Sequence, residues 1–280
     1  MTFPTPFLNL IARGAVALSL ALVASHAGAA VLAQDGFQSY STGALNGANG
    51  GSGWGGAWSA TGNANVVDPA TNLSGNRALA LTGNASNAAV RTLASSFSGD
   101  SLFVSFLLQV DRGSSIDRND FVGLWLDLGT SNGGANRPNI GIKGNQDSSS
   151  ATNDIFARTT GTSGSYAPDS NLDVLDTYLV VGHLYRNAAG NYTNFDLWLN
   201  PTADDFLSPD ASFTGNAGIS AIDRVGIRLA NIDSGDRILI DNLRLSTTFQ
   251  EATAVPEPGV LGLLGLGLAG LGAMRRRKQA

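Results

Sequence analysis

The 280-residue sequence has no cysteine and few of the side chains that usually carry proton transfer or metal binding. The missing cysteines exclude disulfides, thiolate nucleophiles and cysteine-ligated metal centres. Glutamate occurs twice, as Glu251 and Glu257, and both positions lie near the C-terminus. The acidic side chains of the rest of the chain are therefore all aspartates. Without disulfides, stability must come from buried apolar surface and hydrogen bonds.

Basic side chains are scarce as well. Lys143 is the sole lysine before a basic cluster at the C-terminus, and acidic residues outnumber basic ones between the two ends of the chain. Binding to nucleic acid requires a basic face that neutralises phosphates, so we expect no nucleic-acid partner. The charge balance favours cations or neutral polymers as ligands.

The first 29 residues have the features of a secretion signal. An apolar run from Phe7 to Ala24 precedes the small side chains of residues 25–30, a pattern that signal peptidase accepts. The run is short for a membrane-spanning helix that stays attached. We therefore predict a signal peptide at 1–29, a β-sandwich domain at 30–250 and a sorting and anchoring segment at 251–280.

The C-terminal segment combines three features in a fixed order. Pro256, Glu257 and Pro258 form a strip whose prolines lack amide donors and hold the chain extended. An apolar stretch at about 259–274 follows, and we expect it to form a helix slightly shorter than the ~20 residues that span a bilayer comfortably. The last feature is a run of four cations: Arg275, Arg276, Arg277 and Lys278. The positive-inside rule keeps such a run on the cytoplasmic side of the membrane.

This ending resembles the PEP-CTERM sorting domain of Gram-negative bacteria. The proline strip, the apolar stretch and the basic run occur in the order of that domain at the very terminus. The resemblance implies an exosortase-type membrane protease as a partner, an intermediate anchored in the inner membrane, and a final location at the cell surface or in the extracellular matrix. An ordinary tail anchor with a proline-rich linker is the alternative.

Residues 31–248 show the pattern of an all-β protein. Short β-rich runs alternate with clusters of glycine, asparagine, serine and aspartate, which is typical of a sandwich or barrel, and no convincing helix interrupts them. The predicted strands are Ala78–Leu81, Ala89–Phe97, Leu102–Val110, Phe121–Leu128, Asn139–Lys143, Asp154–Arg158, Thr177–Arg186, Thr193–Leu199, Arg224–Leu229 and Arg237–Ser246.

Local patterns refine three of these strands. The apolar alternation of the last strand changes phase at Asp241–Asn242, which predicts a β-bulge. The segment Ala188–Asn191 predicts a hairpin turn between the two strands that flank it. Pro201 then ends the second of those strands, because proline cannot donate to the ladder.

Four short segments resemble concanavalin A-like, laminin G-like sandwiches: Asp35–Tyr40, Gly53–Trp58, Phe195–Pro201 and Ile240–Arg244. The resemblance implies a jelly roll of two sheets with about a dozen strands, in which the first and last strands lie near each other. A β-helix is the competing architecture, but the sequence has no fixed-period repeat.

The predicted domain lacks the residues that glycan hydrolysis usually needs. Glycosidases on such a sandwich work with paired carboxylates, usually glutamates. The local aspartate pairs, Asp204 with Asp205 and Asp117 with Asp120, lie in turn-like polar segments and fit solvated loop acids. His183 lies in mid-strand, where we expect it to pack or hydrogen-bond within the sheet. We therefore predict no catalytic residue and a non-enzymatic protein, with a hydrolase that uses aspartates as the alternative.

Two residue pairs are candidates for ligand binding. Asp35 and Asp241, which the sandwich resemblance brings together, are candidate calcium ligands, because calcium prefers hard oxygen donors. Turn-capping by these side chains is the alternative. Trp54 and Trp58 lie in a glycine-rich loop and are candidates for stacking on sugar rings, unless they fold back to close the end of the sandwich.

Taken together, the sequence predicts an exported, non-enzymatic surface or matrix protein that associates with extracellular polysaccharide. Its other expected partners are signal peptidase, the exosortase-type protease and, through the C-terminal helix, the membrane. A calcium-dependent lectin and a structural coat component without a ligand remain open alternatives on the same fold. Apart from calcium, we expect no cofactor.

Overall fold

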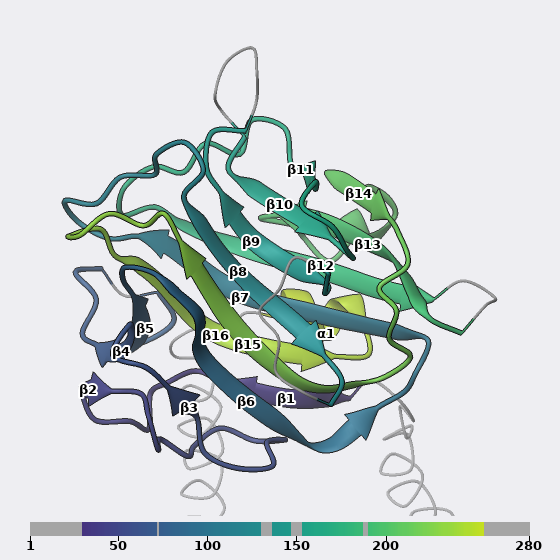
Figure 1. The fold of residues 1–280 in the computed structure, drawn as a ribbon, viewed down its shortest axis with the longest axis horizontal. Helices are drawn as coiled ribbons and strands as arrows, with labels where there is room; N and C mark the ends of the chain where they lie inside the picture. The colour runs from purple at the N-terminus through teal and green to yellow at the C-terminus, as the bar shows by residue number, and fades with distance from the viewer. Residues whose placement is uncertain (1–29, 72, 130–135, 147–152, 187–189, 255–280) are drawn as a thin grey trace, which may run out of the picture.

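The computed structural model shows two antiparallel β-sheets packed face to face, so the predicted all-β sandwich is confirmed (Figure 1). The structure describes residues 30–71, 73–129, 136–146, 153–186 and 190–254. The predicted signal peptide, the proline strip, the apolar stretch and the basic run lie outside this part of the chain. Within it, no helix has the length and apolar character that a membrane span requires.

The first sheet has nine strands in the order β14-β13-β12-β7-β16-β5-β4-β2, and β1 also pairs with β16. Its strands are β1 (Val31–Asp35), β2 (Gly43–Ala44), β4 (Ala64–Val67), β5 (Ala78–Leu81), β7 (Ser101–Val110), β12 (Thr177–Arg186), β13 (Tyr192–Leu199), β14 (Ala211–Thr214) and β16 (Ile238–Ser246). The antiparallel pairing of β1 with β16 joins the first and last strands, as the jelly-roll resemblance implied.

The second sheet has seven strands in the order β11-β10-β9-β8-β15-β6-β3. Its strands are β3 (Ser59–Ala60), β6 (Ala85–Phe97), β8 (Phe121–Asp127), β9 (Asn139–Lys143), β10 (Ile155–Arg158), β11 (Ser165–Tyr166) and β15 (Ile222–Ala230). Neighbouring strands are antiparallel throughout. Two short helical segments complete the described chain: a 3-10 turn at Asp205–Leu207 and the helix α1 (Phe249–Thr253).

All ten predicted strands are present, and the predictions for β5, β9 and β12 match at both ends. The bulge is confirmed, because the register of β16 against β7 shifts between Asp241 and Arg244. Strand β13 ends at Leu199, ahead of Pro201. Residues 187–189 of the predicted hairpin turn lie outside the described residues, but the antiparallel pairing of β12 with β13 is as expected.

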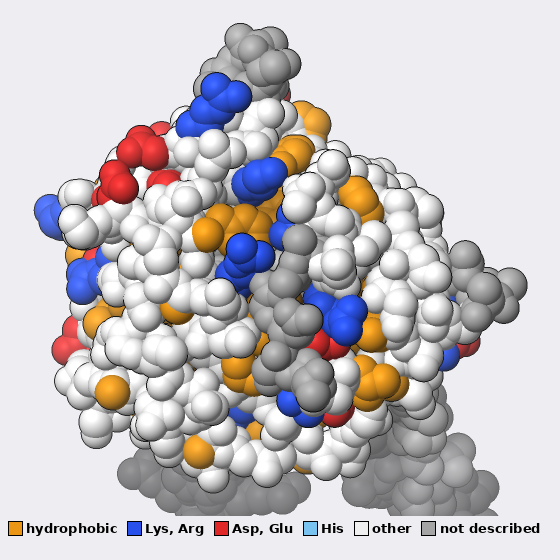
Figure 2. Space-filling view, viewed as in Figure 1, with side chains coloured by type: hydrophobic (Ala, Val, Ile, Leu, Met, Phe, Trp, Pro, Cys, Tyr) orange, Lys and Arg blue, Asp and Glu red, His pale blue; other side chains and the backbone are white. Residues whose placement is uncertain are grey.

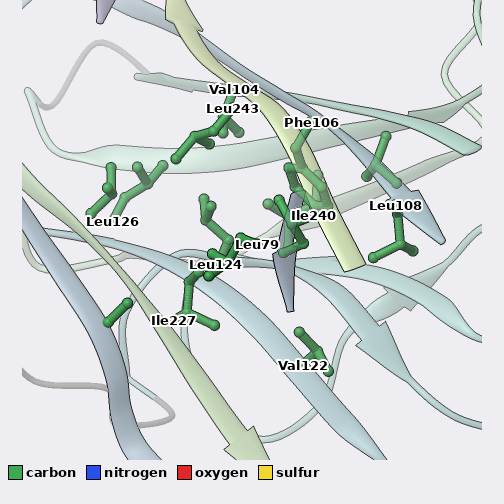
Figure 3. Packing of buried hydrophobic residues seen from close by; sticks show 14 of the residues in the cluster. Leu79, Val104, Phe106, Leu108, Val122, Leu124, Leu126, Ile227, Ile240 and Leu243 are labelled. Carbon is green, nitrogen blue, oxygen red and sulfur yellow. The ribbon is translucent and has the colours of Figure 1, made fainter. Parts of the chain in front are cut away.

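The core lies between the sheets because every second side chain of each strand points inward (Figure 3). The labelled side chains, each at most 1% exposed, are Leu79, Val104, Phe106, Leu108, Ile240 and Leu243 from the nine-stranded sheet and Val122, Leu124, Leu126 and Ile227 from the seven-stranded sheet. Burial of a side chain of this size contributes about 1.5–3 kcal/mol. This layer holds the two sheets together without a disulfide.

The outer face of the nine-stranded sheet is covered by a second apolar layer. Phe249 and Ala252 of α1 pack there against Phe103, Val181 and Trp198. The helix α1 begins directly after residues 31–248, for which no helix was expected, and it was not itself predicted. Five residues are too few to show a helical period in the sequence, and tertiary contacts hold α1 in place.

Side chains fix both ends of α1. The Thr248 hydroxyl accepts a hydrogen bond from the Glu251 amide at 3.3 Å and so caps the N-terminus. At the other end, Arg244 Nη1 donates to the carbonyl oxygens of Glu251 and Ala254, both at 2.7 Å. The packed chain thus continues to Ala254.

Candidate functional site

The outer face of the seven-stranded sheet has a strip of glycines over which aromatic rings lie flat. Gly123 and Gly141 are directly opposed on β8 and β9, and Gly226 on β15 is opposed to Trp125. A Cβ atom built on Gly226 would lie 2.0 Å from the Trp125 ring, and one on Gly123 would lie 2.6 Å from the Phe121 ring. The rings occupy the space that the missing side chains leave, so they form a layer directly on the sheet.

Two arginines pack on this aromatic layer. The Cζ atom of Arg158 lies 5.4 Å from the centroid of the Phe121 ring and 5.2 Å from that of Phe156. Arg228, which comes from β15, has its Cζ atom 5.6 Å from the Phe121 ring. These are cation–π distances, and they hold two guanidinium groups from different strands against one ring.

Lys143 adds a third positive charge, and we call Lys143, Arg158 and Arg228 the cationic layer. Burial lowers the pKa of Arg158 to about 10; Tyr166 opposes this shift and the charge of Arg228 adds to it. Burial, and then Arg158, lowers the pKa of Lys143. Both Arg158 Nη1 and Lys143 Nζ donate to the carbonyl oxygen of Thr162, at 3.0 and 3.4 Å. The three cations are thus close enough to disfavour one another.

A polar pocket extends this face toward the far edge of the sheet. It has a volume of about 410 Å³, and its lining includes Ser59, Asn87, Val90, Thr92 and Arg224. Figure 2 shows lysine and arginine side chains around an apolar strip over β8, β9 and β10. From β3 to β11 the face crosses seven strands, or roughly 29 Å at the usual strand spacing.

The predicted calcium ligand Asp35 is the counter-ion of a buried arginine. Its Oδ2 atom lies 2.6 Å from Arg91 Nη1, and both side chains are 1% exposed. The same oxygen accepts hydrogen bonds from Trp58 Nε1 at 2.8 Å and from the Tyr40 hydroxyl at 2.6 Å. Its Oδ1 atom accepts from the Phe37 amide at 3.0 Å. Both carboxylate oxygens are therefore occupied by donors of the chain itself.

Asp241 lies near Asp35, as expected, but it is also saturated with hydrogen bonds. Its Oδ2 atom accepts from the amide of Ser74 at 3.0 Å and from its hydroxyl at 2.6 Å, and Oδ1 accepts from the Asn242 amide at 2.6 Å. Burial raises the pKa of Asp241 to about 6, and the charge of Asp35 contributes. In the part of the chain that the structure describes, no three acidic or histidine side chains are grouped to hold a metal ion. The hydrogen bonds to both carboxylates favour the turn-capping alternative over calcium binding at this pair.

The structure corrects the stacking interpretation of Trp58. This side chain is 1% exposed and its indole nitrogen donates to Asp35, so no ring face is open to a ligand. Trp54 is half-buried, and its indole nitrogen donates to the Gln34 carbonyl at 2.9 Å. The Arg91 Cζ atom lies 5.0 Å from the Trp54 ring and 5.4 Å from the Trp58 ring. Both tryptophans thus help to enclose the buried Arg91–Asp35 pair. This arrangement agrees with the alternative in which the tryptophans fold back and close the end of the sandwich.

The aspartates considered for acid–base work have local structural roles. Asp205 is partly exposed, and its carboxylate accepts hydrogen bonds from the amide and the hydroxyl of Thr202, which lower its pKa. Asp120 is buried, which raises its pKa to about 6, and its carboxylate accepts from the Asp117 amide at 2.7 Å. Each carboxylate closes a turn of its own loop.

His183 packs within the sheet, as predicted. Its ring stacks on Phe103 with centroids 4.1 Å apart and on Tyr185 at 4.6 Å. The Nε2 atom shares a hydrogen bond with the Ser101 hydroxyl at 2.6 Å. Burial lowers the pKa of His183 to about 4, so the imidazole is neutral near pH 7.

The cationic layer is the feature that the sequence analysis missed. Its members come from β9, β10 and β15, and strand pairing alone brings them together. One signal was available in the sequence. Arg224, Gly226 and Arg228 alternate with buried Val225 and Ile227, which places both arginines on one outer face.

Comparison with known proteins identifies the C-terminal segment. The family model of the PEP-CTERM protein-sorting motif matches residues 254–278, which include Pro256, Glu257 and Pro258. The motif and the fold together define an exported β-sandwich protein. More particularly, the motif implies routing to the cell surface and processing by exosortase, a membrane protease. No curated protein matches the sequence.

Several solved structures are similar to this chain at low identity. The alginate lyase Aly36B is 14% identical with a TM-score of 0.46, and the match covers 77% of this chain and 97% of the lyase. A carbohydrate esterase from the Shiga toxin-encoding bacteriophage phi24B is 16% identical with a TM-score of 0.46, covering 79% and 100% of the two chains. The CBM22-1 xylan-binding domain of Paenibacillus barcinonensis Xyn10C is 10% identical with a TM-score of 0.36, covering 79% and 97%.

Proposed function

We propose that the protein is a non-enzymatic surface or matrix protein that binds extracellular polysaccharide through the outer face of the seven-stranded sheet. The observation that carries this proposal is the cationic layer, held on aromatic rings beside a polar pocket. Lys143, Arg224 and Arg228 are partly exposed there, so their donors reach solvent. Such donors suit the hydroxyl, ring and acidic oxygens of a sugar polymer.

The difference between the two outer faces supports the same choice. On the nine-stranded sheet, α1 and the residues around Trp198 form an apolar cover. The seven-stranded sheet instead has charged and polar side chains from β9, β10, β11 and β15 on its outer face. A face roughly 29 Å wide suits an extended polymer better than a single small molecule.

The environments of the aspartates support a non-enzymatic role. A general acid for glycoside cleavage needs a carboxyl group with a raised pKa that reaches the scissile oxygen. Asp205 has the opposite shift, and Asp120 has a raised pKa but is 2% exposed and bonded to its own turn.

Affinity electrophoresis in gels that contain the organism's own exopolysaccharide tests the proposal. We expect the polysaccharide to retard the wild-type protein, and Lys143→Gln combined with Arg228→Gln to reduce the retardation strongly. The matched control is Arg112→Gln with Arg118→Gln, which removes the same charge from two exposed loop positions. Absence of wild-type retardation would contradict polysaccharide binding. Release of reducing ends from the polysaccharide would contradict a non-enzymatic role.

We also propose the export route in detail. Signal peptidase removes residues 1–29, the apolar stretch at about 259–274 anchors an intermediate in the inner membrane, and exosortase then acts at the proline strip. Pro256→Ala with Pro258→Ala should leave the C-terminal segment on the chain and keep the protein in the membrane fraction. Mass spectrometry of the mature protein checks both ends, and normal release of the variant would contradict the role of the strip.

A further inference from the structure

Most arginines of the described chain have an aspartate partner, but Arg158, at the centre of the cationic layer, has none, and neither does Lys143. Ion pairs with aspartates are formed by Arg77, Arg91, Arg137, Arg186, Arg224 and Arg237. Arg158 and Lys143 belong to none of them. Both donate to one neutral acceptor, the carbonyl oxygen of Thr162.

Arg158 is buried as well as unbalanced. The residue is 3% exposed, and its Nε atom is buried without a hydrogen-bond partner. A buried charge without a counter-ion is costly, because desolvation is not offset by a Coulombic partner. The rings of Phe121 and Phe156 hold the guanidinium in place, so the group is positioned before any ligand arrives.

The neighbours of Arg158 increase the local positive potential. Arg228 packs on the same Phe121 ring, and the charges of Arg158 and Lys143 disfavour each other. Tyr166, on the adjacent strand β11, has its ring 6.2 Å from that of Phe156 and is partly exposed. The face therefore combines a planar cation, a compact cation and a hydroxyl donor within one cluster.

We infer that the polymer bound by this face is an acidic polysaccharide, and that Arg158 and Lys143 pair with the carboxylate groups of its sugar units. A guanidinium fork matches a carboxylate in two parallel hydrogen bonds, and an ammonium adds a point charge. The Tyr166 hydroxyl and Arg228 contact the neighbouring sugar oxygens. The inference rests on the proposed function. The net charge of the chain favours a neutral polymer as the ligand, but the ligand contacts the local cluster of cations. The local charge therefore favours an acidic polymer.

Binding to two forms of one polymer tests the charge of the ligand. Polygalacturonate and its fully methyl-esterified form share a backbone and differ in the carboxylate. We expect the full-length mature protein to bind polygalacturonate at least about ten-fold more tightly than the ester, as a charge-assisted pair implies. Dextran sulfate serves as a third probe, and we expect weaker binding to it than to polygalacturonate.

Variants test the assigned residues. Arg158→Met and Lys143→Met should each remove most of the preference for polygalacturonate over the ester, whereas Arg118→Met, at an exposed loop position, should retain it. Lys143 is half-buried, so Lys143→Met serves as the second variant if Arg158→Met fails to fold, which circular dichroism reports.

The outcomes separate the inference from the proposed function. Equal wild-type binding to both polymers would overturn the acidic ligand and leave polysaccharide binding intact. Equal or tighter binding to dextran sulfate would overturn the carboxylate assignment. An unchanged preference in both variants would overturn the assignment of Arg158 and Lys143. No binding to these polymers or to the organism's own exopolysaccharide would overturn the proposed function itself.

Discussion

At the scale of single residues, buried polar groups of this sandwich are held by specific partners. His183 shares a hydrogen bond with Ser101 and lies between two aromatic rings, which keeps it neutral. Asp35 neutralises Arg91 in an environment closed by Trp58. Each of these arrangements ties stability to one group, so each gives a test at one position.

The first test concerns pH. The pKa of His183 is lowered from 6.5 to about 4 in the folded state, so between these values the unfolded chain binds a proton that the folded chain does not. Stability from this group is therefore present above about pH 6.5 and lost as the pH falls toward 4. His183→Phe keeps a ring against Phe103 and removes the titration.

Urea unfolding at pH 7 and pH 4.5 measures the effect. We expect the variant to lose less free energy of unfolding than the wild type between these two pH values, by on the order of 2 kcal/mol. The raised pKa values of Asp120 and Asp241 act in the opposite direction, but they are present in both proteins and cancel in the difference. Parallel pH profiles of the two proteins would show that His183 is not held neutral.

The second test concerns the buried ion pair. Asp35→Asn leaves the Arg91 guanidinium buried without its counter-ion, which should cost about 3–5 kcal/mol of unfolding free energy. Asp68→Asn is the control, because Asp68 pairs with Arg77 at the surface and is 66% exposed. We expect less than about 1 kcal/mol there. Similar losses in both variants in urea titrations would contradict the structural role of Asp35.

The third test concerns calcium. Because hydrogen bonds already occupy the carboxylates of Asp35 and Asp241, we expect saturating calcium to leave the melting temperature unchanged relative to chelator. A rise with calcium that disappears in Asp241→Asn would instead support the calcium-dependent lectin alternative.

At the scale of elements, the longer strands could be predicted because each is a run of β-favouring residues bounded by clusters of glycine, asparagine, serine and aspartate. Strands β7, β8 and β9 are buried along nearly their whole length, so the runs themselves and not an alternation of buried and exposed side chains gave the signal. The short strands β2, β3 and β11 have two residues each, too few to show a period, and they exist only through pairing with longer neighbours. The cationic layer could not be predicted from the sequence for a related reason. Phe121, Arg158 and Arg228 are far apart in the sequence, and only the order β10-β9-β8-β15 makes them neighbours.

Glycines of the loop between β2 and β3 give a test at this scale. Gly53 has a φ of +80°, and a Cβ atom there would lie 1.9 Å from the Leu32 carbonyl oxygen of β1. The backbone of β1 cannot move aside as the end of a flexible side chain could. Gly53→Ala should therefore destabilise the fold by more than about 2 kcal/mol. Gly56→Ala is the control, since nothing lies within 4 Å of its Cβ position. Equal melting temperatures of the two variants would contradict the tight approach of this loop to β1.

At the scale of the whole molecule, one face has a positive charge although the chain as a whole has a negative net charge. The chain has a net charge of −5, yet the seven-stranded sheet gathers cations on one outer face (Figure 2). Long-range repulsion and local attraction toward an acidic polymer then oppose each other, and salt screens the longer-range part more strongly.

This predicts an optimum of affinity at intermediate salt. Binding of the wild-type protein to an acidic polymer should first strengthen as salt screens the net charge, and then weaken as it screens the contacts of the cationic layer. Affinity electrophoresis over a series of sodium chloride concentrations measures the profile. Affinity that does not change with salt would indicate that charge has no part in recognition.

The hydrogen bonds from Arg244 to the end of α1 have a consequence for processing. Arg244 holds the carbonyl of Ala254, and Pro256 follows two positions later in the sequence. In the proposed export route, exosortase therefore acts only a few residues along the sequence from a helix end that side chains fix. A product cleaved at the strip would then carry few residues beyond this helix, and its new C-terminus would lie close in sequence to the packed part of the chain.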